Sequence, residues 1–192
     1  TEYPYLIPSI YLDFDIGTDY VVVQSSMIIK SKLNEPPKLV LKGNQIKLLS
    51  ISIDGKELKS EEYKISDKEL IVDNPSVLEF ELKITSQIDP FRNTSLEGLY
   101  LSSGMLTTQC EAEGFRSICY HPDRPDVLSK YTVRLEADRT AYPVLLSNGN
   151  KKYSGKLKTN ISRHEIIWED PFPKPCYLFA LVAGKLNSVS DT

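Results

Sequence analysis

Apolar and polar residues alternate with a period of two along most of this chain. The clearest case is residues 77–84, where four apolar side chains alternate with Glu and Lys residues. Successive side chains of a β-strand point to opposite faces, so this pattern predicts a half-buried strand, whereas a helix would scatter the apolar residues. Residues 10–16 and 131–138 repeat the pattern and predict two more strands of the same kind.

Further strands are expected where β-branched and aromatic residues gather between turn signals. These strands are residues 20–30, 38–41, 46–53, 63–65, 70–72, 143–147, 151–158 and 161–168. Residues 177–183 are apolar on both faces and predict a central buried strand. The dipeptides Asp54-Gly55 and Asn148-Gly149 favour tight hairpin turns, and residues 17–19 predict a third hairpin. Pro171, Pro173 and Pro175 predict a stiff connector.

These patterns predict an all-β fold, made either of two packed sheets or of one strongly curved and twisted sheet. No segment has convincing helical periodicity. The centre, residues 86–130, is expected to be rich in loops. It could close with one helical turn within residues 123–130, where Pro125 is tolerated in a first turn.

The least strand-like stretch is residues 107–127, TTQCEAEGFRSICYHPDRPDV. Its density of charged and aromatic residues is typical of a binding surface and equally of a loop held by its own ion pairs. Glu111 and Glu113 would need a cleft and shifted pKa values to act as a general acid and base. The alternative for Glu113 is a salt bridge to Arg116 or Arg124.

The chain offers no convincing metal site. His164-Glu165 begins like the zinc-protease motif His-Glu-x-x-His, but Trp168 occupies the position of the second histidine. That motif requires two histidines on one face of a helix, and here the local pattern predicts a strand. We therefore expect His164 to be an ordinary strand residue. His121, the other histidine, has no ligand-like spacing to the cysteines.

Composition narrows the class of protein. A chain of 192 residues fits one domain or at most two small ones, and 41% hydrophobic and 26% charged residues are typical of a soluble globular protein. A net charge of −3 argues against nucleic-acid binding, and no apolar run reaches the ~20 residues of a membrane span. Three cysteines, an odd number, favour reduced and buried thiols in a reducing compartment.

Four runs carry a resemblance to a known family. They are QCEAEGFR at 109–116 with its continuation to DRPDV at 123–127, LEGLY at 96–100, LSNGN at 146–150, and DPFPKPCYLFALVAG at 170–184. In order and spacing they resemble the N-terminal domain of the bacterial aminopeptidase N (alanyl aminopeptidase) family of zinc metallopeptidases. The resemblance implies a saddle-like β domain over residues 1–185 that packs against a thermolysin-like catalytic domain. Residues 186–192 would begin the connection to it.

The resemblance also implies roles for two residues. Glu111 matches a family Glu that helps to hold the free α-ammonium of a peptide substrate, and Gln109 matches a Gln that lines the first side-chain pocket. The family's zinc ligands, general base and catalytic tyrosine have no match here. The resemblance therefore implies that zinc binds in the catalytic domain and that the isolated chain is inactive. We expect peptides with a free N-terminus and the catalytic domain as partners, no nucleic acid or membrane partner, and a cytoplasmic location.

Two alternatives remain at this point. A free-standing β-sandwich module for binding would have a self-contained surface without a large apolar face. A relative of the family hydrolyses an epoxide and has a Gln in the place of Glu111, so Glu111 favours a peptidase.

Overall fold

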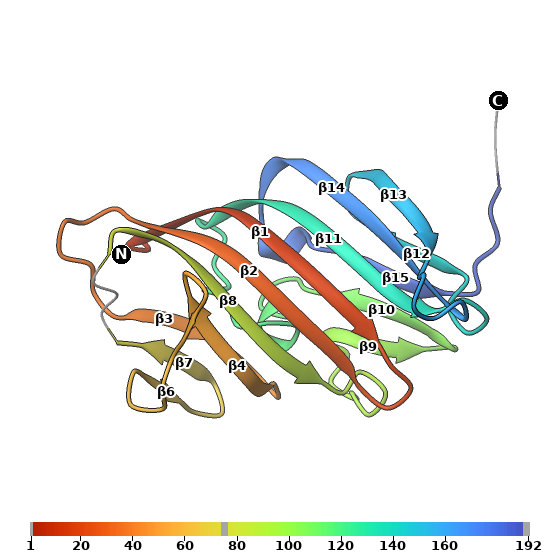
Figure 1. The fold of residues 1–192 in the computed structure, drawn as a ribbon, viewed down its shortest axis with the longest axis horizontal. Helices are drawn as coiled ribbons and strands as arrows, with labels where there is room; N and C mark the ends of the chain where they lie inside the picture. Colours follow the sequence, from red (N-terminus) through yellow and green to blue (C-terminus); the bar gives the residue numbers. More distant parts are fainter. Residues whose placement is uncertain (1, 74–76, 190–192) are drawn as a thin grey trace.

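The described part of the chain folds into three β-sheets (Figure 1). This computed structural model describes residues 2–73 and 77–189. The strands are β1 (Tyr5–Ile16), β2 (Val21–Ser31), β3 (Leu39–Lys42), β4 (Lys47–Ile53), β5 (Lys56–Glu57), β6 (Tyr63–Ile65), β7 (Glu69–Val72), β8 (Glu79–Ile88), β9 (Gly98–Ser102), β10 (Met105–Gln109), β11 (Leu128–Asp138), β12 (Val144–Ser147), β13 (Asn150–Lys156), β14 (Arg163–Pro175) and β15 (Leu181–Gly184). Two short 3-10 helices, η1 (Phe115–Ser117) and η2 (Cys176–Leu178), are the only helical elements in the described ranges. In those ranges no helix has the length and apolar character needed to cross a membrane.

The largest sheet has eight strands in the order β13-β14-β11-β1-β2-β8-β4-β5. Every pair in it is antiparallel except β1 and β11, which run parallel from Ser9 opposite Lys130 to Asp15 opposite Glu136. The alternating residues of both strands point into the core, and Leu12 is completely buried. The all-β prediction is therefore confirmed, with mixed strand directions at the centre of this sheet.

Two smaller sheets complete the fold. One has four strands in the order β12-β15-β10-β9, and the other has three in the order β3-β7-β6. Figure 1 shows the four-stranded sheet beneath the large one. Phe14 of β1 stacks on Phe179, which precedes β15, with ring centroids 6.1 Å apart. The core of this part of the molecule thus lies between two packed layers.

The loop-rich centre contains more structure than the sequence predicts. Strands β9 and β10 form a hairpin there, closed by Ser103 and Gly104, both with positive φ. The prediction missed it because both strands are short and their outward residues are not consistently polar, so the period-2 signal is weak.

Asn148-Gly149 does not close a hairpin between its flanking strands. Strand β12 pairs with β15, and β13 pairs with β14, so the dipeptide joins two different sheets. Gly149 has a φ of +88°, and a Cβ there would collide with the carbonyl oxygen of Glu169. The turn signal predicted the backbone conformation correctly, but packing between the sheets decided which strands pair.

The three prolines belong to a strand rather than to a separate connector. Strand β14 continues to Pro175, which lies opposite Leu128 of β11. Its pairing with β13 ends at Glu169, so beyond that point β14 has a ladder partner on one side only. Proline is tolerated on such an edge because its missing N–H need not serve a second ladder.

Two other predictions also need correction. Residues 123–130 contain one hydrogen-bonded turn rather than a turn of helix: the Val127 N–H donates to the Arg124 carbonyl oxygen at 3.3 Å across Pro125 and Asp126, and β11 begins at Leu128. The strand predicted over residues 177–183 is shorter: η2 comes first and β15 follows, at the centre of the four-stranded sheet. The expected connection at residues 186–192 includes residues 190–192, which lie outside the described residues.

Candidate functional site

A tight turn presents the two residues singled out by the sequence. Gln109 ends strand β10, and residues 111–113 then stand exposed between buried Cys110 and buried Gly114. The Gly114 N–H donates to the Cys110 carbonyl oxygen at 2.9 Å and closes the turn. A Cβ on Gly114 would collide with the Gln109 carbonyl oxygen, so the chain can fold back this closely only with glycine. We call residues 110–114 the acidic turn.

Gln109 and Glu111 lie together on the surface. The Gln109 Nε2 donates to the backbone oxygen of Glu111 at 3.1 Å. Among the described residues, nothing donates a hydrogen bond to the Glu111 carboxylate or forms an ion pair with it. Glu111 is therefore an exposed carboxylate that is available to a cation from outside the domain.

Glu113, two residues further on, is in a different state. Its Oε2 lies 3.1 Å from the Nη1 of Arg116, so the predicted salt bridge to Arg116 is present. Arg124, the other partner considered, forms an ion pair with Asp126 in which its Nε lies 2.7 Å from a carboxylate oxygen. Only one of the two glutamates of the acidic turn thus remains unpaired in the described part of the chain.

The acidic turn rests on a buried aromatic cluster. Phe115 is fully buried, and its ring meets those of His121, Tyr131 and Phe179 edge-on, with centroids 5.1, 6.2 and 5.4 Å away. Burial lowers the pKa of His121 to about 4, so this ring is neutral near pH 7. The turn that carries Glu111 is therefore anchored to the core of the domain.

The acidic turn lies at the end of an uncovered sheet surface. Leu146, Val182, Thr107 and Tyr100 face one another in register across β12, β15, β10 and β9. Directly opposed residues share a face, and none of these four is buried. Gln109 is two residues beyond Thr107 on β10 and so belongs to the same face. We call this surface the outer face of the four-stranded sheet.

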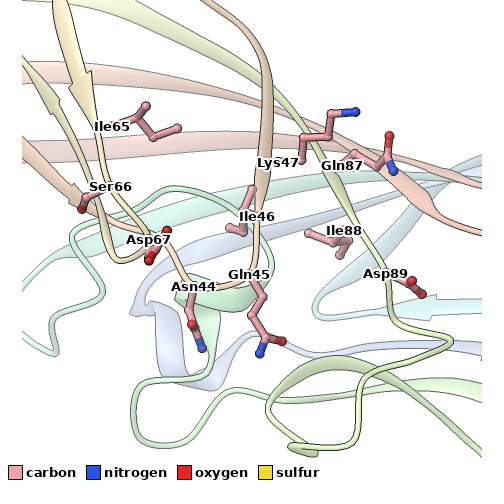
Figure 2. A pocket seen from close by; sticks show the side chains of 10 residues that line it. All are labelled: Asn44, Gln45, Ile46, Lys47, Ile65, Ser66, Asp67, Gln87, Ile88 and Asp89. Atoms are coloured by element: carbon pink, nitrogen blue, oxygen red, sulfur yellow. The ribbon is translucent and has the colours of Figure 1, made fainter.

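A hollow of the described surface lies elsewhere (Figure 2). Its volume is about 630 Å³, and it lies between the start of β4, the turn joining β6 to β7, and the end of β8. The side chains that line it are Asn44, Gln45, Ile46, Lys47, Ile65, Ser66, Asp67, Gln87, Ile88 and Asp89. A neighbouring hollow shares Asn44 with it and reaches Glu113 and Arg116. Neither hollow is lined by Gln109 or Glu111, and both of these residues are exposed.

The residues that the structure describes do not fit a zinc ion. Within residues 2–73 and 77–189 no three His, Cys, Asp or Glu side chains are arranged to hold a metal. His164 lies in β14, as predicted, and its Nε2 is 2.8 Å from the Tyr142 carbonyl oxygen. All three cysteines are free and buried, and burial raises the pKa of Cys110 to about 12. These thiols therefore remain protonated, which disfavours both metal ligation and nucleophilic attack.

Comparison with known proteins gives one consistent result. Residues 7–178 match the sequence profile of the peptidase M1 N-terminal domain. Aminopeptidase N of Caulobacter vibrioides is 47% identical over 190 residues, and that of Escherichia coli is 45% identical over 189 residues. Each match covers 98% of this chain but only 21% of the relative. The crystal structure of Legionella pneumophila aminopeptidase A in complex with aspartic acid superposes with a TM-score of 0.91 at 35% identity, over 97% of this chain and 22% of that one.

Proposed function

This chain belongs to the peptidase M1 N-terminal domain family, and from that premise we propose that it is the N-terminal domain of a zinc-dependent aminopeptidase. The chain spans about a fifth of the length of the aminopeptidases N that it matches. The proposed activity is removal of N-terminal residues from peptides by the longer protein. In it, this domain supplies one wall of the active site and performs no chemistry itself.

The observation that carries the proposal is that one of two neighbouring carboxylates forms an ion pair and the other does not. Glu113 is paired with Arg116, whereas Glu111 is exposed and unpaired among the described residues. We infer that Glu111 pairs with the α-ammonium of the substrate. At 4 Å such a pair gains roughly 4 kcal/mol at an effective dielectric constant of 20. An internal peptide bond has no positive charge there and would leave the carboxylate desolvated and unpaired, so it would be rejected.

Gln109 has the supporting role in this proposal. Its amide is neutral and already donates to the Glu111 backbone oxygen, so it can contact the first side chain of the substrate without competing for the ammonium. The presence of Glu111 favours a peptidase over the epoxide-hydrolysing alternative.

The outer face of the four-stranded sheet supports the proposed contact with a catalytic domain. It is apolar at Leu146 and Val182 and leads to Gln109, so a domain covering it would bring its own groups to the acidic turn. A free-standing binding module has no evident need for such a face. Zinc would be held by that second domain, where it supplies Lewis-acid activation of the scissile carbonyl or of water. Free, buried thiols support a reducing, cytoplasmic location.

The test is substitution of Glu111 in the full-length protein. Glu111→Ala should lower kcat/KM on an aminoacyl p-nitroanilide by tens to thousands of fold, since loss of one partner of a desolvated charge pair costs roughly 2–5 kcal/mol. Because Glu111 is exposed in this domain, the melting temperature should stay close to that of the wild type.

Glu113→Ala is the matched control. It removes the neighbouring carboxylate and its ion pair with Arg116, so it should lower stability. It should reduce kcat/KM far less than Glu111→Ala does, because Glu113 is not proposed to contact the ammonium. Near-wild-type kcat/KM in a well-folded Glu111→Ala protein would remove Glu111 from the site.

A further inference from the structure

Asp123 is a buried carboxylate that joins three segments of the domain. Its side chain is completely shielded from solvent. The Oδ2 accepts hydrogen bonds from the Arg116 Nε at 2.7 Å and from the Arg116 backbone N–H at 3.2 Å. The Oδ1 accepts from the Cys176 Sγ at 3.1 Å, and the Asp123 N–H donates to the His121 Nδ1 at 3.0 Å. Asp123 thereby connects η1, η2 and the segment between η1 and β11.

Arg116 extends this connection to the acidic turn. Its Nε binds Asp123 while its Nη1 binds Glu113, so one guanidinium lies between a buried carboxylate and an exposed one. The arginine side chain is only 23% exposed, whereas that of Glu113 is 70% exposed. Arg116 therefore connects the exposed acidic turn, which would otherwise be free to move, to the buried and fixed carboxylate of Asp123.

We propose that Asp123 is a positioning residue for Glu111, acting through Arg116 to hold the acidic turn in one place relative to the substrate. This inference rests on the proposed function of Glu111. In this proposal Asp123 does not contact substrate, because its side chain is completely buried and its carboxylate accepts hydrogen bonds from Arg116 and Cys176.

The physical reason is that a carboxylate that binds the substrate ammonium must lie at one position relative to the reacting bond. The turn is exposed on residues 111–113, and its carboxylates repel each other unless one of them is neutralised. Arg116 neutralises Glu113 and, because its planar guanidinium donates in fixed directions, also fixes where Glu113 lies. Glu111 is then the single free carboxylate of the turn, at a set distance from the reacting bond. A displacement of about 1 Å at such a position can cost a large factor in kcat/KM. Because the ammonium is bound in the ground state and in the transition state alike, this loss should appear in KM.

The experiment is a double-mutant cycle in the full-length enzyme, with KM and kcat measured on an aminoacyl p-nitroanilide. Asp123→Asn, which keeps the shape and removes the charge, should raise KM about tenfold with little change in kcat. In a Glu111→Gln background the same substitution should change KM little, because there is no longer an anchor to position. A purely structural role would weaken the enzyme equally in both backgrounds.

Two further variants keep the test decisive. Arg116→Lys retains the positive charge but cannot bind Asp123 and Glu113 with one rigid fork, so it should raise KM in the same direction even if Asp123→Asn folds poorly. Asp126→Asn is the matched control, because Asp126 is an aspartate of the same loop that pairs with Arg124 at the surface. It should leave KM unchanged.

The outcomes separate the two proposals. If Glu111→Gln leaves kcat/KM unchanged, the proposed function fails and Asp123 has nothing to position. If Glu111→Gln lowers kcat/KM while Asp123→Asn and Arg116→Lys leave KM at the wild-type value, or raise it equally in both backgrounds, the positioning role fails and the function of Glu111 stands.

Discussion

At the scale of single residues, His121 shows how strongly this core depends on one protonation state. Its side chain is fully buried, and its Nδ1 already accepts the Asp123 N–H. The Nε2 is buried and has no hydrogen-bond partner among the described residues. Asp123 is the charged group that faces it and favours protonation, but burial has the larger effect and lowers the pKa to about 4. A charged imidazolium is therefore poorly tolerated at this position.

We expect stability to fall between about pH 6.5 and pH 4 because of His121. In this window the unfolded chain takes up a proton on His121 and the folded chain does not, so the free energy of unfolding decreases as the pH falls. The contribution is on the order of 3 kcal/mol across the window. Urea unfolding at several pH values should show a steeper dependence for the wild type than for His121→Gln. An equal dependence of the unfolding free energy on pH in the two proteins would contradict the claim that burial keeps His121 uncharged in the folded state.

At the scale of elements, the acidic turn depends on the absence of a side chain at Gly114. A Cβ there would collide with the Gln109 carbonyl oxygen and lie 3.0 Å from the Cys110 Cα, and these backbone atoms cannot move aside cheaply. The hydrogen bond that closes the turn would then be strained or lost.

Gly114→Ala should therefore destabilise the domain by about 1–3 kcal/mol, as overpacking in a tight site does. Gly155→Ala in β13 is the control. The three atoms nearest to its Cβ would all belong to the side chain of Tyr153, which is exposed and can rotate away. Chemical denaturation of both variants measures the difference. Equal losses of stability would show that the close approach at Gly114 is unimportant.

Elements that are determined by contacts between residues close in the sequence could be predicted, whereas those determined by distant residues could not. Strands such as β8 and β11 were predictable because one face is buried and the other is not, which gives a local period of two. The partners of β12 and β13 were not, because pairing across two sheets depends on residues distant in the sequence.

The same distinction applies to the site. The salt bridge of Glu113 to Arg116 was predictable because the two are three residues apart. Gln109 and Glu111 were singled out through the family resemblance alone, since no local pattern marks a free carboxylate, and their roles stay a prediction. Asp123 was missed because one of its partners, Cys176, is 53 residues away.

At the scale of the whole molecule, the outer face of the four-stranded sheet should behave differently in the isolated domain and in the full-length protein. Leu146 is 39% exposed in the domain. Leu146→Asp should thus change the melting temperature of the domain little but lower that of the full-length protein, where it would place a charge in an apolar contact. Leu49→Asp is the control, because Leu49 is similarly exposed on β4 of the large sheet. Equal effects of the two substitutions in the full-length protein would argue against this face as the contact.

The isolated domain is also expected to bind no stoichiometric zinc. The described residues form no metal-ligand cluster, and the thiols that could bind zinc are buried and protonated. Elemental analysis of the dialysed domain measures this directly, and one tightly held zinc ion per chain would overturn the expectation.

The parallel pairing of β1 with β11 has a consequence for how the protein is made. Ser9 and Lys130 are opposite each other in the sheet although 121 residues separate them in the sequence. At ~5–20 residues per second, a ribosome needs on the order of ten seconds to synthesise that interval. During it, β1 has emerged with β2 on one side and an open edge on the other, which is a template for pairing with a foreign strand. The acidic turn is synthesised within this interval, before β11 pairs with the open edge of β1, so the turn that carries Glu111 emerges while this edge is still exposed.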